Sequence, residues 1–175
     1  MAHPNATERI QFGEWQASDL PQAQLLWGDP DVTRLISKDG FSPQMIVDRL
    51  ALEVRSLAQD QVQYWPLFAA DGDLIGCCGL HARPHGEYEL GYHLRPAYWH
   101  QGLATEAAKA VVQYATTQLH APALIAGHNP ANLASKHVIL KLGFQYTHDE
   151  LYPPTGKYSP MYRLVLQGDT EAKGT

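Results

Sequence analysis

Cysteine is scarce in this sequence, which has two among its 175 residues, the neighbours Cys77 and Cys78. Adjacent side chains of a strand point to opposite faces, so the geometry opposes an intramolecular disulfide between them. Apolar residues and glycines flank the pair at 74–76 and 79–80. This setting favours buried strand thiols over a reactive nucleophile. The cysteines therefore agree with a reducing compartment.

Positive charge is scarce too, since 13 lysines and arginines stand against 18 aspartates and glutamates and give a net charge of −5. Such a chain has no general electrostatic attraction to nucleic acid or anionic lipid. Long apolar runs are missing, and residues 1–5 lack the basic and apolar regions of an export signal. We therefore expect a cytoplasmic protein whose partners are neither nucleic acid nor membrane.

Internal repeats, low-complexity blocks and linkers are also missing. With 45% hydrophobic and 18% charged residues, the composition is that of a packed globular domain. A length of 175 residues fits one such domain with a sizeable core. We expect a single domain over residues 1–175, ordered from about residue 8 to residue 166, with a disordered tail at 167–175.

Hydrophobic periodicity, turn residues and capping signals predict a fold of the α/β (α+β) class. Strands are expected at residues 9–15, 64–70, 74–81, 87–94, 123–127, 144–148 and 161–166, and helices at 18–27, 42–57, 102–119 and 130–142. The three strands between residues 64 and 94 are expected to form an antiparallel meander. Ser18, Ser42 and Asn129 are the expected N-caps, the last two because a proline follows.

The stretch 87–106 places a strand, a short loop and the start of a long helix in direct succession. The unpaired N–H groups and the dipole of such a helix start make a natural anion site. Gly102 and Ala104 would let the backbone approach a phosphate closely, and Thr105 offers a hydroxyl donor. On this segment alone, a helix that begins with glycine only to pack closely on its strand is an equally good interpretation.

Two segments together carry a family resemblance: YWHQGLATEA at 98–107 and NPANLASKHVILKLGF at 129–144. With them the chain resembles the GNAT N-acetyltransferase superfamily, in particular the branch of the ribosomal-protein N-terminal acetyltransferases. The resemblance covers roughly residues 8–166 and includes WGDPDV at 27–32. It implies a mixed, mostly antiparallel central sheet flanked by helices, with acetyl-CoA as co-substrate.

The resemblance also implies which residues bind coenzyme A. The family pattern of Gln or Arg, two residues, Gly, one residue, then Gly or Ala falls on Trp99, Gly102 and Ala104. Tryptophan departs from the general pattern but is common in this branch. The strand beside Leu94 is implied to pair with the pantetheine. The loop implied to hold the pyrophosphate consists of Gln101, Gly102, Leu103, Ala104 and Thr105.

Two further positions belong to this implied binding site. Asn132 and Ser135 lie three apart on one helix face, where the resemblance places contacts to the pantetheine or phosphoadenosine arm. Helix capping and solvation are the alternative for both. At His100 many relatives have glycine. Its imidazole could narrow the pyrophosphate loop or donate to a phosphate, and an exposed loop histidine is the other interpretation.

Acetyl transfer needs a proton acceptor for the amine and a group that meets the departing thiolate. Strand alternation places Glu89 and His93 on one face, and a mid-strand carboxylate is rarely buried without a partner. Glu89 is therefore predicted to accept the proton, directly or through water, with a structural ion pair as the alternative. His93 could also take a proton, although a satisfied core histidine is the more frequent outcome.

For the thiolate, Ser135 is the first candidate because it lies inside a matched motif. The other hydroxyl candidates are Tyr146, Tyr152, Tyr158 and Tyr162. Tyr152 and Tyr158 are expected in a loop at the substrate entrance, and the tyrosines are expected mostly to pack. The nine histidines form no convincing cluster, so no metal site is expected.

The sequence therefore predicts an N-acetyltransferase that moves an acetyl group from acetyl-CoA to a primary amine by direct attack in a ternary complex. The acceptor could be a protein N-terminus, an antibiotic, a polyamine or another small amine, and the net charge mildly favours a cationic one. The alternatives are a non-catalytic acyl-CoA-binding sensor or interaction module, and an enzyme for longer acyl groups. The oligomeric state stays open, with a homodimer as one alternative.

Overall fold

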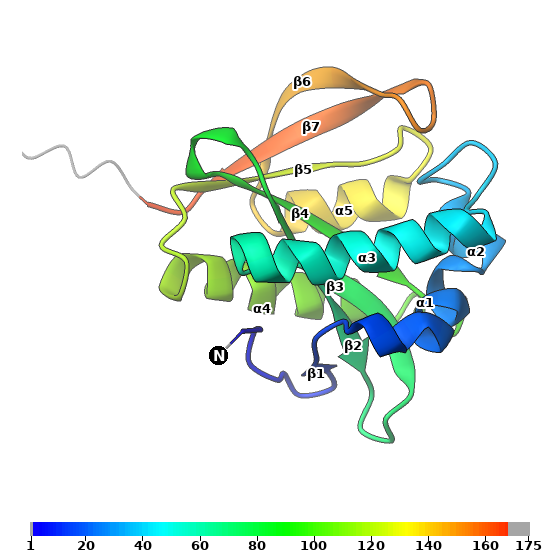
Figure 1. Cartoon of the computed structure of the whole chain (residues 1–175). Coiled ribbons are helices and arrows are strands. Elements are labelled where there is room, and N and C mark those ends of the chain that lie inside the picture. Colours follow the sequence, from blue (N-terminus) through cyan, green and yellow to red (C-terminus); the bar gives the residue numbers. More distant parts are fainter. Residues whose placement is uncertain (1, 168–175) are drawn as a thin grey trace, which may run out of the picture.

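The computed structural model of the chain describes residues 2–167 (Figure 1). Its strands are β1 (Gln11–Phe12), β2 (Tyr64–Phe68), β3 (Leu74–Ala82), β4 (Tyr88–Leu94), β5 (Ala123–Gly127), β6 (Gln145–Tyr152) and β7 (Lys157–Val165). Its α-helices are α1 (Leu20–Trp27), α2 (Pro30–Thr33), α3 (Pro43–Asp60), α4 (Leu103–Thr117) and α5 (Leu133–Lys141), with short 3₁₀ turns at Ala17–Asp19, Pro84–Gly86 and Pro96–Tyr98.

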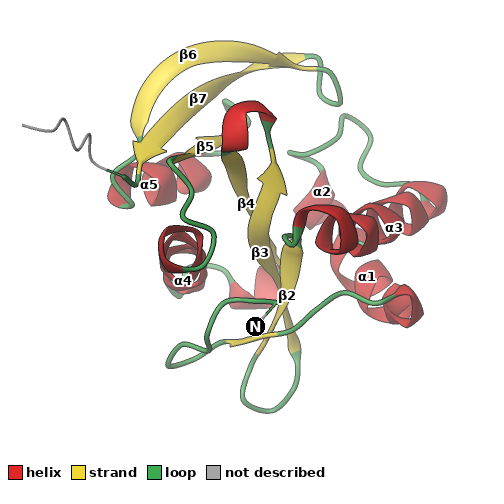
Figure 2. Cartoon of the chain, turned by 60° about the vertical axis from the view of Figure 1, so that its left-hand side comes forward, coloured by secondary structure: helices red, strands yellow, loops and turns green. Residues whose placement is uncertain are grey.

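One sheet of seven strands, in the order β1-β2-β3-β4-β5-β7-β6, forms the centre of the molecule. Its neighbours pair antiparallel except β4 and β5, which are parallel. Figure 2 shows α4 and α5 on one side of this sheet and α1 and α3 on the other. This architecture confirms the expected α/β class with a mixed, mostly antiparallel sheet flanked by helices.

Each face of the sheet has its own hydrophobic core. Trp27, Leu50 and Cys77 belong to the core under α1 and α3. Val111 and Cys78 belong to the core under α4 and α5. The two adjacent thiols are buried, free and on opposite faces, as strand alternation predicts. Among residues 2–167, no helix combines the length and apolar character needed to cross a bilayer.

Of the expected N-caps, only Ser42 is confirmed, because its hydroxyl accepts from the Met45 N–H at 3.2 Å. Ser18 lies inside a 3₁₀ turn that precedes α1, so its assignment as a cap was wrong. Asn129 was wrong as well, because its side chain closes a turn by accepting from the Ala131 N–H at 2.9 Å. Helix α5 therefore starts three residues later than expected, with Asn132 as its N-cap.

The strands differ most from expectation at the two ends of the chain. Strand β1 has two residues rather than the expected 9–15. The expected loop at 149–160 is mostly paired, because β6 and β7 form a long hairpin whose register runs to Tyr152 opposite Lys157. At the expected tail, the Gln167 side-chain amide donates to the His120 carbonyl at 2.6 Å, and residues 168–175 lie outside the described part of the chain.

Candidate active site

Strands β4 and β5 are paired only where they begin. Tyr88 pairs with Leu124 and Glu89 with Ile125, although β4 continues to Leu94 and β5 to Gly127. Each strand is held by its other neighbour, β4 by β3 and β5 by β7, so the two diverge. The later residues of both strands therefore lack a strand partner on their facing edges, where an extended ligand can pair. At the end of β4, the Leu94 carbonyl accepts a hydrogen bond from the Trp99 indole at 2.8 Å.

The loop after β4 leads into α4 through Gly102, which has a left-handed φ of 75°. A Cβ atom at this position would meet only the Arg9 Nη2 atom, at 3.7 Å. The glycine is therefore required by the backbone conformation and not by close packing on the strand. Among the described residues, the N–H groups of Leu103, Ala104 and Thr105 have no hydrogen-bond partner, which leaves the first turn of α4 free to bind an anion.

Arg9 adds a positive charge beside this loop, and the sequence analysis did not find it. Its Nη1 atom donates to the Gln101 carbonyl at 2.8 Å, and its Nε atom lies 3.1 Å from the Glu106 carboxylate. The Gln101 side chain turns back to the Ala97 carbonyl at 3.0 Å. His100 is exposed and has a left-handed φ of 59°, a conformation in which glycine is common. No short motif links Arg9 to the loop in sequence, so only the fold reveals this contact.

Helix α5 brings Ser135 to the divergent end of β4. The Asn132 side chain accepts from the Ser135 N–H at 3.0 Å, so capping occupies its oxygen. The Ser135 hydroxyl lies 2.9 Å from the Tyr92 hydroxyl, which also lies 3.2 Å from the Ser135 carbonyl. Burial raises the pKa of Tyr92 well above its usual value, so this hydroxyl stays protonated. Tyr92 was missed because alternation placed it on the face opposite Glu89.

The other tyrosine candidates are dispersed. Tyr162 is buried with its hydroxyl 3.1 Å from His128 Nε2, and Tyr146 donates to Asp149 at 3.1 Å. Tyr152 and Tyr158 lie in the paired strands of the β6–β7 hairpin, so their placement in a loop was wrong. Tyr152 lines a cavity that also contains Glu89, whereas the Tyr158 side chain is largely exposed.

This cavity, of about 200 Å³, lies between the β3–β4 hairpin and the β6–β7 hairpin. Its lining residues are His81, Ala82, Arg83, Glu89, Glu150, Leu151, Tyr152, Ser159 and Met161. The Glu89 side chain is 26% exposed and forms an ion pair of 2.5 Å with Arg83. Both interpretations of Glu89 thus have a structural counterpart, the cavity for a proton acceptor and the arginine for a structural ion pair.

His93 is a core histidine. The Trp27 indole donates to its Nδ1 atom at 3.0 Å, and Cys77 Sγ lies 3.7 Å from the same atom. Burial first, and then the positive charge of Arg49, lower the pKa of His93 to about 3. The ring is therefore neutral at physiological pH. It is not among the residues that line the cavity.

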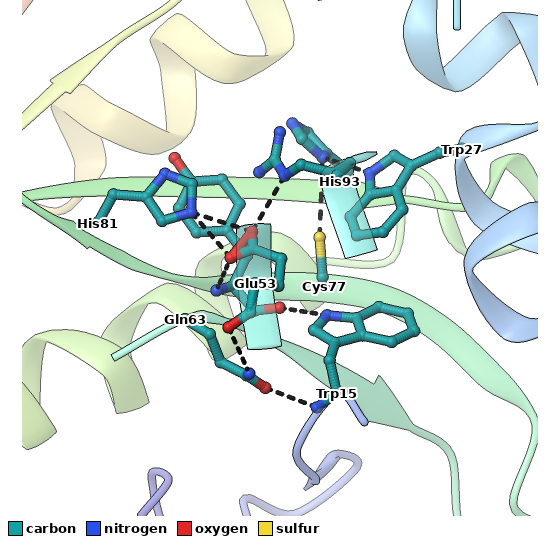
Figure 3. A network of polar contacts seen from close by, with 9 residues as sticks. Trp15, Trp27, Glu53, Gln63, Cys77, His81 and His93 are labelled. Carbon is teal, nitrogen blue, oxygen red and sulfur yellow. Dashed lines mark hydrogen bonds and ion pairs between the residues drawn. The ribbon is translucent and has the colours of Figure 1, made fainter. Parts of the chain in front are cut away.

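Behind the cavity lies a buried polar network centred on Glu53, which the sequence analysis also missed (Figure 3). Its carboxylate contacts Arg49 Nε at 3.0 Å, His81 Nε2 at 2.8 Å and the Tyr64 N–H at 2.8 Å. Burial alone would raise the pKa of Glu53, but the His81 hydrogen bond and the Arg49 charge lower it to about 2. The sequence did contain a sign of this network. Glu53 lies three residues after Leu50, so it is a charged residue on the apolar face of α3.

Comparison with known proteins adds to this geometry. A model of the family described as acetyltransferase (GNAT) domain matches residues 9–145. The chain is 26% identical over 143 residues to the uncharacterized N-acetyltransferase p20 of Bacillus licheniformis, which covers 79% of this chain and 80% of that protein. The ribosomal-protein-S5-alanine acetyltransferase of Vibrio fischeri superposes with a TM-score of 0.78 at 16% identity over 95% of this chain and 98% of that one. Spermidine N-acetyltransferase from Vibrio cholerae, in complex with CoA and spermine, superposes with a TM-score of 0.75 at 13% identity over 91% of this chain and 97% of that one.

Proposed function

Because this chain belongs to the GNAT acetyltransferase family, we propose that it transfers the acetyl group of acetyl-CoA to a primary amine, which attacks the thioester directly in a ternary complex. The divergence of β4 from β5 beside the open first turn of α4 carries this proposal. It offers an edge that can pair with an extended amide chain, and N–H groups that can hold a pyrophosphate a few residues further on.

The residues proposed to bind the co-substrate are those at this junction. Leu94, at the end of β4, marks the edge that would pair with the pantetheine. The loop residues Gln101, Gly102, Leu103, Ala104 and Thr105 would hold the pyrophosphate through the N–H groups of the first turn of α4. Asn132 and Ser135 would contact the co-substrate from α5, with Asn132 using its side-chain nitrogen because its oxygen caps the helix.

The proposed chemistry divides between the two faces of β4. Glu89, in the cavity, takes the proton of the acceptor ammonium, and the neutral nitrogen then bonds to the acetyl carbon as the carbon–sulfur bond breaks. On the opposite face, the Ser135 hydroxyl, which is hydrogen-bonded to Tyr92, donates a hydrogen bond to the departing thiolate, and the proton that the thiolate finally takes comes from solvent. The proton acceptor and the group that stabilises the thiolate are thus separate residues.

The proposed acceptor is a cationic amine. Two carboxylates, Glu89 and Glu150, line the cavity, where Arg83 offsets one of them. The structural neighbours named above include an enzyme bound to spermine and an enzyme for a ribosomal protein. The alternative, a non-catalytic acyl-CoA-binding module, would need no carboxylate cavity beside the co-substrate site, so Glu89 and its surroundings favour an enzyme.

A panel of amines tests this proposal. Acetyl-CoA would be incubated with the protein and a peptide with a free N-terminus, spermine or an aminoglycoside antibiotic, while free CoA thiol is followed. We expect amine-dependent CoA release, with the acetylated product seen by mass spectrometry. Tight binding of acetyl-CoA without turnover of any amine would instead identify a binding module. A larger kcat/KM with a longer acyl-CoA would correct the acyl donor.

A further inference from the structure

A histidine connects the buried Glu53 to the cavity that Glu89 lines. His81 Nε2 lies 2.8 Å and 3.0 Å from the two oxygens of the Glu53 carboxylate, which is fully buried (Figure 3). His81 also lines the cavity and is the direct cross-strand partner of Glu89 in the β3–β4 register. Directly opposite residues of antiparallel strands project from the same face of the sheet. Glu53, His81 and Glu89 therefore form a series of neighbouring side chains from the interior to the wall of the cavity.

The hydrogen bonds fix which nitrogen of His81 carries hydrogen. An ionised carboxylate only accepts hydrogen bonds, so Nε2 must be the donor to Glu53. In the neutral ring, Nδ1 then holds the lone pair. Within residues 2–167 this atom has no hydrogen-bond partner, and the side chain is 26% exposed. His81 thus keeps a proton-accepting atom free in a ring at the cavity wall.

The surroundings hold the His81 ring in this orientation. It stacks on the Tyr64 ring with centroids 4.0 Å apart and an interplanar angle of 11°. Glu53 is fixed in turn by the Tyr64 N–H and by Arg49. A proton arriving at Nδ1 would make an imidazolium, whose charge the Glu53 carboxylate stabilises at hydrogen-bond distance. The arrangement is that of a base held in one tautomer by a buried carboxylate.

Building on the proposed function, we propose that His81 is the group on which the proton of the acceptor ammonium comes to rest, and that Glu53 is a positioning residue for it. The proton leaves the ammonium for Glu89 and passes across the cavity to Nδ1 of His81. The amine nitrogen keeps its electron pair and attacks the acetyl carbon. An imidazole suits this role because the buried Glu53 carboxylate, at hydrogen-bond distance, stabilises the cation that the proton creates.

The pH dependence of this step depends on the charged and titratable groups around the imidazole. These groups are Glu53 and Arg49 from α3, Tyr64 from β2, Arg83 from the β3–β4 turn, Glu89 and His93 from β4, and Glu150 and Tyr152 from β6. A variant of His81 removes the imidazole and keeps all of these neighbouring side chains, although Glu53 then loses one hydrogen-bond donor. His81→Gln is therefore the central variant, and His85→Asn, at an exposed position with a left-handed φ of 64°, is the matched control.

With the best amine of the panel, we expect His81→Gln to lower kcat/KM about 10²-fold at pH 7 and to approach the wild type near pH 10, where solvent deprotonates the amine. Its affinity for acetyl-CoA should not change. Imidazole in the buffer should restore activity to His81→Ala, and His85→Asn should behave as the wild type. Glu53→Gln should reduce kcat and shift the acidic limb of the pH profile, although Glu53 does not line the cavity.

A measurement on the wild-type protein keeps the inference testable if a His81 variant fails to fold. Nitrogen-15 spectra of the histidine rings should show hydrogen on Nε2 of His81 and none on Nδ1 at pH 8. The opposite tautomer would overturn the inference, as would full activity of a folded His81→Gln from pH 6 to pH 9. A wild type that binds acetyl-CoA but turns over no amine would overturn the proposed function itself, so the two failures are distinguishable.

Discussion

At the scale of single residues, environment decides what otherwise similar side chains can do. Glu53 and Glu89 are both carboxylates near the same cavity. Glu53 is fully buried and bound by Arg49 and His81, whereas Glu89 is partly exposed and paired with Arg83 at the cavity wall. A fully buried carboxylate cannot contact a substrate, so Glu53 can act only through the side chains that it binds. The partly exposed Glu89 can take part directly.

The role of Glu89 is tested by Glu89→Gln, which keeps shape and removes the base. We expect kcat to fall by roughly 10² or more, because a proton acceptor is lost, while the Kd for acetyl-CoA stays nearly constant. Glu87→Gln is the matched control, since Glu87 precedes β4, pairs with Arg163 and does not line the cavity. If Glu89→Gln retains full kcat from pH 6 to pH 9, the ion pair with Arg83 is the whole role of Glu89.

His93 predicts how the stability depends on pH. Its pKa is lowered by burial to about 3 in the folded protein, against 6.5 for the ordinary side chain. As pH falls below 6.5, the unfolded chain binds a proton that the folded chain refuses, so this stability is present above pH 6.5 and is lost toward pH 3. Between pH 6.5 and pH 5 the loss should reach about 2 kcal/mol.

Urea unfolding at these pH values measures this effect. His93→Gln should lower stability at pH 7 but should remove most of the dependence between pH 6.5 and pH 5. Glu53 does not interfere in this interval, because its pKa changes from 4.5 to about 2 on folding and so affects stability only at lower pH. An unchanged pH dependence in His93→Gln would show that other groups cause it.

At the scale of elements, the proposed site lies where the backbone groups of two strands and of a helix start have no hydrogen-bond partner within the sheet or the helix. β4 and β5 separate after two paired positions, and α4 begins with a glycine that provides no side-chain cap. In a fully paired sheet or a capped helix these backbone groups would be satisfied within the chain. The β6–β7 hairpin contributes in another way, because it extends past β5 and forms one wall of the cavity.

Gly102→Val tests the start of α4 against a matched glycine. Gly86 has a φ of 73°, nearly that of Gly102, and a Cβ there would meet no atom within 4 Å. Valine at either position strains the left-handed backbone, so both variants should lower the melting temperature similarly. Only Gly102→Val should weaken acetyl-CoA binding, by at least about tenfold, because its branched side chain obstructs the approach of the phosphates. Calorimetric titration measures the Kd for acetyl-CoA of both variants. If the two Kd values are equal, Gly102 is not part of the acetyl-CoA site.

At the scale of the whole molecule, one hydrophobic core packs on each face of the sheet, and the central strands β4 and β5 diverge between the two cores. The core under α1 and α3 surrounds the Glu53 network, and the core under α4 and α5 supports the proposed co-substrate site. Strand β4 has residues in both environments, since Glu89 and His93 lie on one face and Tyr92 on the other. A ligand that pairs with β4 would therefore connect both halves of the fold.

Acetyl-CoA should consequently stabilise the entire domain. At a concentration 100 times its Kd, a ligand that binds only the folded state adds about 2.7 kcal/mol of stability, which a thermal melt detects. NAD and ATP are the controls, since they carry phosphates but no pantetheine chain to pair with β4. No shift at millimolar acetyl-CoA, or equal shifts with all three ligands, would contradict the proposed binding mode.

The sequence by itself determined the local structure and the family. Periodicity predicted the strands of the meander and the long helices, and the segments at 98–107 and 129–144 indicated an acetyltransferase. These signals depend on neighbours within a few residues, where spacing alone decides which side chains share a face. The cap at Ser42 was readable for the same reason.

Only the tertiary structure decided which distant residues meet. Arg9 reaches the loop at Gln101, Tyr92 reaches Ser135, and Glu53 reaches His81, each across a separation in sequence that no periodic pattern describes. The expected loop at 149–160 is a different case, because its two halves pair with each other in a local hairpin around the turn at 153–156. The prolines and glycine of this segment indicated a turn but not the length of the paired strands on either side of it. The sequence could thus indicate which kinds of residue handle protons. Which of these residues lie next to one another depends on how the elements pack, and only the tertiary structure shows it.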